Sequence, residues 1–287
     1  MQEIRNSTTN VGITGASGFI GRHLTKALVD RELTVIPLLR GFKTETVKNC
    51  DIIINLAGAN IGKRWTKKHK NEIWSSRINT TKRLSDALNQ VFQHESATGI
   101  KRDRLLISAS ATGIYKSDTD QVYTEKSYEY GDDFLAALCK SWEEEAMRSY
   151  GSARVAIVRF GVVMTKEGGA LPKMILPSRL GIKMIFGTGD QKISWISLED
   201  LVRGILFIIE NRLDGPFNFT APGSLTYNAL TDIISQRHKT FIKIKIPSLI
   251  LGMVMGDGSK VLTSGQITYP ERLIENGFKF NNPLFIA

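Results

Sequence analysis

Three glycines near the amino end are the first residues of this chain whose spacing could serve chemistry. Gly15, Gly18 and Gly21 stand in the segment Thr14-Gly15-Ala16-Ser17-Gly18-Phe19-Ile20-Gly21. One glycine permits a tight turn, the next lets backbone approach a pyrophosphate, and the third lets a helix pack closely on a strand. The amino end of such a helix offers free N–H groups to an anion. The segment predicts a dinucleotide-binding turn formed by Gly15, Ser17, Gly18, Phe19, Ile20 and Gly21.

The elements that must hold this turn alternate through the first 160 residues. Apolar runs predict strands over residues 11–14, 33–39, 51–56, 104–107 and 155–159, and amphipathic patterns predict helices over 18–30, 66–92 and 133–150. This alternation is typical of a parallel sheet with crossover helices. We therefore expect an α/β fold, a Rossmann-like doubly wound parallel sheet with a smaller C-terminal substrate lobe. Because the chain between Arg40 and Cys50 is short, one strand of the usual sheet is expected to be missing or reduced.

Beyond residue 160 the strand–helix rhythm loosens. Glycines at 161, 168, 169, 181, 187 and 189 indicate loops, and the alternating segment 241–247 indicates a half-exposed strand. Ser197 and Asp200 form a capping box that opens a helix. We expect the cofactor-binding domain over residues 1–160 and the substrate lobe over 161–287, with pieces of the lobe returning to the sheet.

The residues after the second predicted strand bear on the choice of cofactor. A fold that prefers NAD usually offers a carboxylate there to the ribose 2′-hydroxyl, whereas one that takes NADP offers arginine to the 2′-phosphate. Here Arg40 ends the strand, Lys43 follows, and no acid occurs before Glu45. Two cations at the place of a phosphate favour NADP(H). The alternative is that Arg40 is an ordinary solvated arginine.

The glycine spacing G-x-x-G-x-x-G resembles that of the short-chain dehydrogenase/reductase superfamily, and the form TGASGFIG resembles its extended, epimerase-like branch. Further segments resemble an atypical subgroup of that branch, the epimerase family proteins or predicted nucleoside-diphosphate-sugar epimerases. They are Asn55-Leu56-Ala57-Gly58-Ala59-Asn60-Ile61, Lys63-Arg64-Trp65-Thr66, Ser76-Arg77-Ile78-Asn79-Thr80-Thr81, Trp142-Glu143 and Gly187-Thr188-Gly189-Asp190-Gln191. The segment 270–280 resembles the subgroup's small C-terminal module, expected over about 240–287. The resemblance covers nearly the whole chain from Val11 onward.

The resemblance adds cofactor contacts to those of the glycine turn. Leu56, Ala57 and Gly58 end the third predicted strand, where small side chains permit the backbone to run close beside the cofactor. The subgroup resemblance implies contacts from Glu72, Arg77 and Val163, although a solvated position for Glu72 is equally open.

The extended branch uses a serine or threonine that orients the substrate and a tyrosine whose phenolate is held by a lysine four residues later. The segment 107–115 resembles the serine-bearing strand end, with Ser110 at the expected position. The Tyr-x-x-x-Lys pair is absent, since Leu135 and Cys139 stand in its place. The catalytic candidates are therefore Ser110 and Tyr115, the nearest remaining acid. Tyr115 could instead be a packed aromatic residue, and Arg159, at a predicted strand end, could face a ligand or form an ion pair.

Two functions follow from these residues. The first is an NADP(H)-binding atypical short-chain dehydrogenase/reductase, an oxidoreductase or nucleotide-sugar epimerase-like enzyme of unknown substrate. The second is a non-catalytic NADP(H)-binding redox sensor or regulatory protein that lacks the proton-transfer pair. The sequence does not decide whether the chain is an enzyme.

The amino-acid composition limits the class of protein and the kinds of partner that this chain can have. With 287 residues, 42% of them hydrophobic, the chain can bury a core and is neither a disordered nor a collagen-like protein. Two cysteines and four histidines show no ligand spacing, so no metal is expected. The net charge is +10, and its densest cluster, in residues 63–70, reads as a solvated helix face near an anionic cofactor rather than a nucleic-acid site.

The remaining expectations concern partners and location. The polar opening segment lacks the apolar core of a signal peptide, and no apolar run is long enough to span a membrane. We expect a cytoplasmic monomer or homodimer with a small-molecule substrate, which could be nucleotide-linked, and with no membrane partner.

Overall fold

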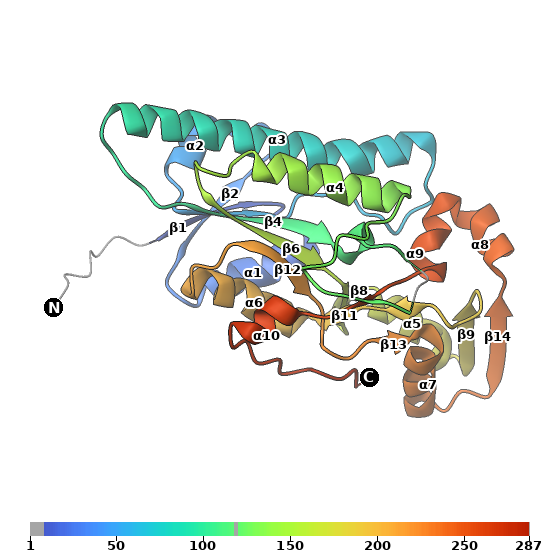
Figure 1. The fold of residues 1–287 in the computed structure, drawn as a ribbon. Coiled ribbons are helices and arrows are strands. Elements are labelled where there is room, and N and C mark those ends of the chain that lie inside the picture. The colour runs from blue at the N-terminus through green and yellow to red at the C-terminus, as the bar shows by residue number, and fades with distance from the viewer. Residues whose placement is uncertain (1–8, 118–119, 287) are drawn as a thin grey trace.

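Six parallel strands form the central sheet of the computed structural model, which describes residues 9–117 and 120–286 (Figure 1). The spatial order is β12-β6-β4-β3-β1-β2. These strands are β1 (Asn10–Thr14), β2 (Thr34–Leu38), β3 (Ile52–Asn55), β4 (Leu105–Ala111), β6 (Arg154–Phe160) and β12 (Gly215–Phe219). Because the chain runs outward from β1 in both directions, the sheet is doubly wound, as the sequence predicts.

Helices cover both faces of the sheet. Figure 1 shows α2 (Thr44–Lys48), α3 (Lys67–Ala97) and α4 (Phe134–Met147) above it and α1 (Phe19–Val29) and α6 (Leu198–Glu210) below. Successive residues of β3 therefore enter different cores: Ile53 packs with Leu84 of α3, while Ile54 packs with Leu24 of α1. This two-sided burial is why β3 is a continuous apolar run.

The sheet ends at β2, which pairs only with β1 among the described strands. The connection from β2 to β3 contains the five-residue helix α2 and no strand. The expected loss of a strand is confirmed, and the carboxyl end of β2 lies at an open edge.

Helix α3 is longer than the predicted 66–92 and ends at Ala97. Glu95, in its last turn, is almost fully buried, and its Oε1 accepts a hydrogen bond of 2.8 Å from Arg104 Nη2. The hydrogen bond from Arg104 lowers the pKa of the Glu95 carboxyl. The extra turn is thus fixed by a partner outside the helix.

The second half of the chain returns to the sheet, as expected, through α6 and β12. Its other elements lie mostly beyond the carboxyl ends of the strands, toward the right of Figure 1, except the last helix, which packs against β12. They are β7 (Val162–Thr165), β8 (Gly168–Gly169), α5 (Leu171–Arg179), β9 (Ile182–Phe186), β10 (Lys192–Ile193), β11 (Trp195–Ser197), β13 (Leu225–Thr226), α7 (Tyr227–His238), β14 (Ile242–Ile246), α8 (Ser248–Met255), α9 (Lys260–Thr263), β15 (Ile267–Thr268) and α10 (Glu271–Glu275). Three short elements, η1 (Thr112–Ile114), β5 (Val122–Tyr123) and η2 (Asp257–Ser259), complete the fold.

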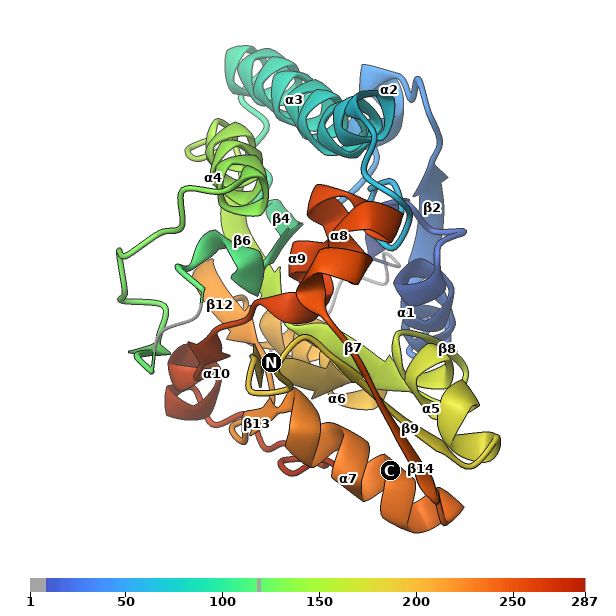
Figure 2. The same ribbon diagram turned by 90° about the vertical axis from the view of Figure 1, so that its right-hand side faces the viewer.

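The C-terminal module docks on the loop between β3 and α3. Trp65 N–H donates to Met255 O over 3.0 Å, and its indole N–H donates to Ile61 O over 2.8 Å. A Cβ on Gly258 would lie 2.8 Å from the Trp65 ring, so the ring fits directly against backbone. Figure 2 shows α8 and α9 between α3 and α7, in front of the sheet. The module therefore lies on the side where the strands end.

None of the helices within the described residues is both long and apolar enough to cross a bilayer.

Candidate functional site

The glycine turn lies between β1 and α1, as predicted. Gly15 has a φ of +71°, and a Cβ there would lie 2.9 Å from the Leu56 carbonyl carbon. A Cβ on Gly21 would lie 2.2 Å from Gly15 O, closer than side-chain atoms approach backbone. The first glycine therefore permits the turn, and the third lets α1 start directly on it.

The amino end of α1 fits an anion. Its N-cap, Gly18, offers no side chain that accepts from the first turn, and that turn contains no acidic residue. The N–H groups of Phe19 and Ile20 thus face outward beside the positive end of the helix dipole. Ser17 and Gly18 are exposed at the tip. A coenzyme pyrophosphate would be held by these backbone groups.

The end of β3 is joined directly to this turn. Leu56 N–H donates to Thr14 O over 3.1 Å, and Ala57 N–H donates to Thr14 Oγ1 over 3.2 Å. Val163 of β7 reaches the same region, because its carbonyl lies against Gly169 and Gly168 lies against the Phe19 ring. The structure therefore brings Leu56, Ala57 and Val163 beside the turn.

Arg77 lies against Gly58, whose Cβ would come within 2.8 Å of the guanidinium carbon. Its N–H groups donate to Ala59 O and Ile73 O, and the guanidinium stacks over Trp142 at 5.2 Å. Burial lowers the Arg77 pKa, and no carboxylate lies within 4 Å of it in the described residues. A half-buried cation without a counter-charge at the carboxyl end of β3 suits an anionic ligand.

Glu72 is turned away from Arg77. Its carboxylate is half exposed and lies 3.0 Å from His69 Nδ1, while His69 Nε2 lies 2.9 Å from Asn60 O. Glu72 therefore braces the loop after β3 in this structure.

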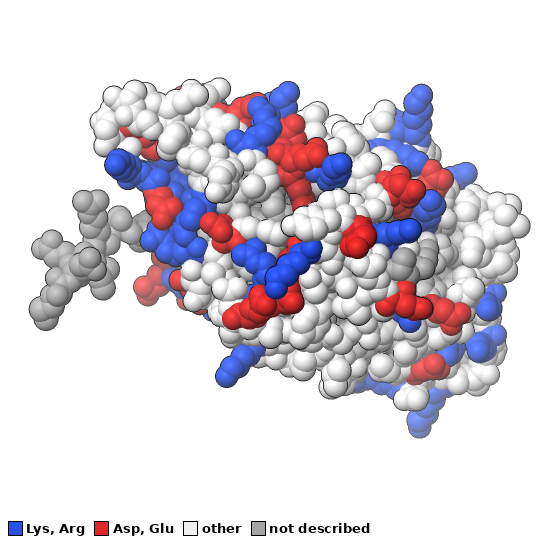
Figure 3. Space-filling view, viewed as in Figure 1, with Lys and Arg blue, Asp and Glu red and all other residues white. Residues whose placement is uncertain are grey.

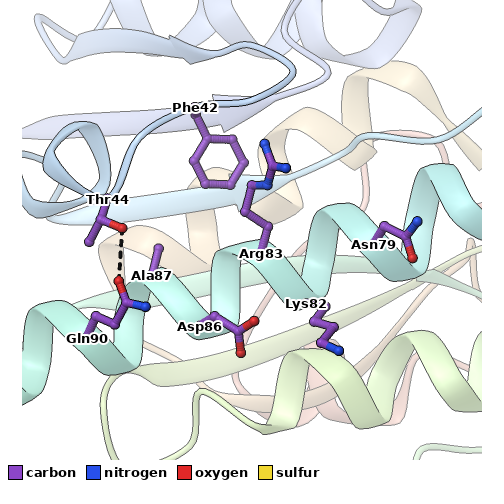
Figure 4. A pocket seen from close by; sticks show the side chains of 8 residues that line it. All are labelled: Phe42, Thr44, Asn79, Lys82, Arg83, Asp86, Ala87 and Gln90. Carbon is purple, nitrogen blue, oxygen red and sulfur yellow. Dashed lines mark hydrogen bonds between the residues drawn. The ribbon is translucent and has the colours of Figure 1, made fainter.

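Arg40 and Lys43 are exposed after the carboxyl end of β2, and neither side chain forms an ion pair in residues 9–117 or 120–286. A hollow of about 420 Å³ adjoins this segment (Figure 4). Phe42 lines it from one side, and the Arg83 guanidinium lies 5.9 Å above the Phe42 ring. The remaining lining residues are Thr44, Asn79, Lys82, Asp86, Ala87 and Gln90. The open edge of the sheet thus offers a concave surface beside free cations.

Ser110 lies at one end of a buried network of hydrogen bonds. Its hydroxyl donates to Glu143 Oε1 over 2.6 Å. Arg159 binds the same carboxylate with two N–H groups, at 2.9 and 2.8 Å. Burial alone would lower the pKa of Arg159, but Glu143 reverses this effect and raises it. Of the two alternatives for Arg159, the structure has the ion pair.

Tyr115 lies at the other end of this hydrogen-bond network. Its hydroxyl accepts from Arg159 Nη1 over 2.7 Å and lies 2.9 Å from Asn218 Oδ1 and 3.0 Å from Thr124 O. The residue is 2% exposed, and burial raises its pKa to about 12 even though Arg159 opposes the shift. A phenol that exchanges protons near neutral pH needs a lowered pKa, whereas the structure buries the Tyr115 hydroxyl against Arg159.

Leu135 and Cys139 lie on α4 where the proton-transfer pair would stand. Burial raises the pKa of the Cys139 thiol to about 12, so this side chain is neutral at physiological pH. Neither residue supplies a charge to the site. Within the described residues no cluster of three or more His, Cys, Asp or Glu side chains could hold a metal ion.

Glu143 is the site residue that sequence reasoning missed. Trp142-Glu143 served only to align the chain with the family. Glu143 lies four residues after Cys139 in α4, hence one turn along the same helix face. That spacing is the signal that could have placed it beside Ser110.

Comparison with known proteins agrees with this geometry. The model of the NAD dependent epimerase/dehydratase family matches residues 11–219, and that of a domain of unknown function, DUF1731, matches residues 246–284. The chain belongs to the NAD dependent epimerase/dehydratase family. Its relatives within that family include the epimerase family protein YfhF of Bacillus subtilis, 34% identical over 292 residues that cover 94% of this chain and 93% of YfhF.

Solved structures extend the likeness of this epimerase family member. The human epimerase family protein SDR39U1, crystallised with NADPH, is 28% identical, with a TM-score of 0.85 and 96% of each chain covered. MoeE5, in complex with UDP-glucuronic acid and NAD, shares the fold with a TM-score of 0.75 at 18% identity, over 95% of this chain and 94% of MoeE5. The recognised resemblance and the α/β fold are thereby confirmed.

Removing the Tyr115 hydroxyl tests its structural placement. Tyr115→Phe is expected to lower the free energy of unfolding by about 1–3 kcal/mol, because a buried Arg159 N–H loses its acceptor. Urea denaturation measures the change, with Tyr128→Phe as control, since Tyr128 is 81% exposed. Equal stability of the two variants would contradict the buried network.

Proposed function

We propose that this chain is an NADP(H)-dependent oxidoreductase or epimerase-like enzyme acting on a small molecule. The observation that carries the proposal is the uncapped amino end of α1 behind the Gly15, Gly18 and Gly21 turn. Arg40 at the open edge of the sheet supports NADP(H) over NAD(H), and the NADPH crystallised with the human relative points the same way.

The residues of the glycine turn, with Leu56, Ala57, Gly58, Arg77 and Val163, would hold the coenzyme. When bound, it supplies or accepts the hydride. The Ser110 hydroxyl donates its one hydrogen to Glu143, so the Ser110 oxygen can still accept a hydrogen bond from another group. Ser110 is therefore suited to hold a substrate hydroxyl, and Glu143 and Arg159 fix its orientation.

The substrate is proposed to be a small hydroxyl or carbonyl compound, with a nucleotide-linked sugar as one candidate. Support for the nucleotide-linked candidate is the fold shared with MoeE5, which was crystallised with UDP-glucuronic acid. A panel of carbonyl compounds, alcohols and sugar nucleotides tests this, with NADPH consumption or NADP⁺ reduction as the readout.

A non-catalytic redox sensor is the second candidate. The observation in its favour is that Leu135 and the neutral Cys139 occupy the place of the proton-transfer pair. Tight NADPH binding without turnover of any compound in the panel would select this function.

Arg40→Glu tests the coenzyme preference. The substitution places a carboxylate where the 2′-phosphate is expected, so NADPH affinity should fall by about 1.5–3 kcal/mol, roughly 10- to 150-fold, while NADH affinity changes little. Isothermal titration with both coenzymes gives the ratio. Lys101→Glu, an equal charge change at another exposed position, is the control. An unchanged NADPH-to-NADH ratio would remove Arg40 from the site.

A further inference from the structure

Helix α8 presents aliphatic side chains to solvent. Of its eight residues, Ser248 is the single polar one and Leu251 the single buried one. Four of the others are exposed: Leu249 by 77%, Ile250 by 45%, Met253 by 63% and Val254 by 62%. Exposed apolar surface of this kind marks a contact site on a protein.

Exposed apolar residues also lie in and before β14, which leads into α8 through Pro247. Phe241 is 79% exposed, and Ile242 and Ile244 of β14 are also exposed. In Figure 3 the end of the molecule where α8 and β14 lie is mostly white, with lysine and arginine groups above and below and some acidic groups near the lower ones. We call Phe241, Ile242, Ile244, Leu249, Ile250, Met253 and Val254 the α8 face.

The charges bordering the α8 face are positive. Lys243 and Lys245 alternate with the isoleucines of β14 and therefore leave the strand on its opposite side, from where their long stems can reach the border of the face. Lys260 follows η2. The loop that bonds to the end of α8 through Trp65 adds exposed Lys63 and Arg64. The acid between α8 and α9, Asp257, is paired with Lys70. The α8 face is thus an apolar surface with a basic border.

We propose that the α8 face binds the surface of an anionic phospholipid bilayer. Aliphatic side chains of a short helix can enter the headgroup region while flanking lysines remain at the phosphates. Eight residues are too few to span a bilayer, so the contact is peripheral. Sequence analysis expected no membrane partner because it weighed only spanning segments.

The border charges argue against a second copy of the chain on this face. A two-fold contact through α8 and β14 would bring the lysines of both copies together without an acidic partner. The hot-spot anchors of a specific protein partner tend to fill pockets, and two hollows, lined by Phe42 with Arg83 and by Arg31 with Phe278, lie elsewhere. Exposed apolar side chains with basic groups near them fit lipid best.

Vesicle flotation of the full chain tests the proposal. At 50 mM NaCl the wild-type protein should float with vesicles of phosphatidylcholine and phosphatidylglycerol (3:1), with a partition coefficient at least about tenfold above that for phosphatidylcholine alone. At 500 mM NaCl the preference should shrink at least about fivefold through screening. Wild-type protein that stays with the lipid-free fraction at 50 mM NaCl overturns the proposal.

Matched variants separate the apolar and basic contributions. Leu249→Glu/Met253→Glu should reduce partitioning at least about tenfold, whereas Val29→Glu/Leu284→Glu, at aliphatic positions that are also exposed but lie elsewhere, should not. Lys243→Glu/Lys245→Glu should also reduce partitioning at least about tenfold, whereas the control Lys26→Glu/Lys101→Glu should not. All variants should retain the wild-type circular dichroism, because the substituted side chains are exposed. Equal binding by a variant pair and its control overturns the proposal.

Light scattering during size-exclusion chromatography, without lipid, tests whether a second copy of the chain binds the α8 face instead. A monomer in both the wild-type and Leu249→Glu/Met253→Glu proteins supports the proposal. A wild-type dimer that this double variant dissociates would assign the α8 face to a second copy of the chain.

Discussion

Replacing Gly21 with alanine is expected to weaken coenzyme binding severely while adding only one methyl group. The new Cβ would lie 2.2 Å from Gly15 O and 2.8 Å from Ala16 O. These are backbone atoms of the turn, so the turn itself must move. Hydrogen bonds from N–H groups to a charged pyrophosphate are worth about 1.5–3 kcal/mol each. Loss of two reduces NADPH affinity by at least about a hundredfold. Isothermal titration measures the loss.

A matched glycine shows that the effect belongs to the turn. Gly252, inside α8, has no atom within 4 Å of its hypothetical Cβ. Gly252→Ala is expected to bind NADPH as the wild type does and to be more stable by up to about 1 kcal/mol, because alanine favours a helix interior. If Gly21→Ala kept wild-type affinity, the glycine turn would not be the coenzyme site.

The elements predicted correctly are those whose pattern of apolar residues follows directly from which of their faces are buried. Strand β3 reads as Ile-Ile-Ile because helices cover both of its faces. The reduced sheet was predictable because the nine residues between Arg40 and Cys50 cannot hold a further strand and its crossovers. The last turn of α3 could not be predicted, since it depends on Arg104 reaching Glu95 from the start of β4.

The same distinction applies to the site. The glycine turn depends only on residues that are neighbours in the sequence, so the spacing of its glycines was enough to predict it. Ser110 was predicted from resemblance, but its partner Glu143 comes from helix α4, which is distant in sequence. The placement of Tyr115 depends on Asn218, more than a hundred residues away. Sequence therefore predicts where the coenzyme is expected to lie better than it predicts the polar network.

Substituting Glu143 tests that network most severely. Glu143→Leu leaves the Arg159 guanidinium buried without its counter-charge, and breaking such a pair costs about 3–5 kcal/mol. The Arg159 side chain is 4% exposed and that of Glu143 is 13% exposed, so solvent offers little compensation. Urea denaturation should show the loss. Glu144→Leu, at the exposed neighbouring position, should change stability by no more than about 0.5 kcal/mol.

A double variant distinguishes charge burial from packing. Adding Arg159→Met to Glu143→Leu removes both charges and should recover most of the lost stability, because an apolar pair of similar volume is often as stable as a buried ion pair. Turnover should not recover, since the Ser110 hydroxyl still lacks the carboxylate that orients it. Recovered stability together with recovered turnover would mean that Glu143 and Arg159 serve the fold alone.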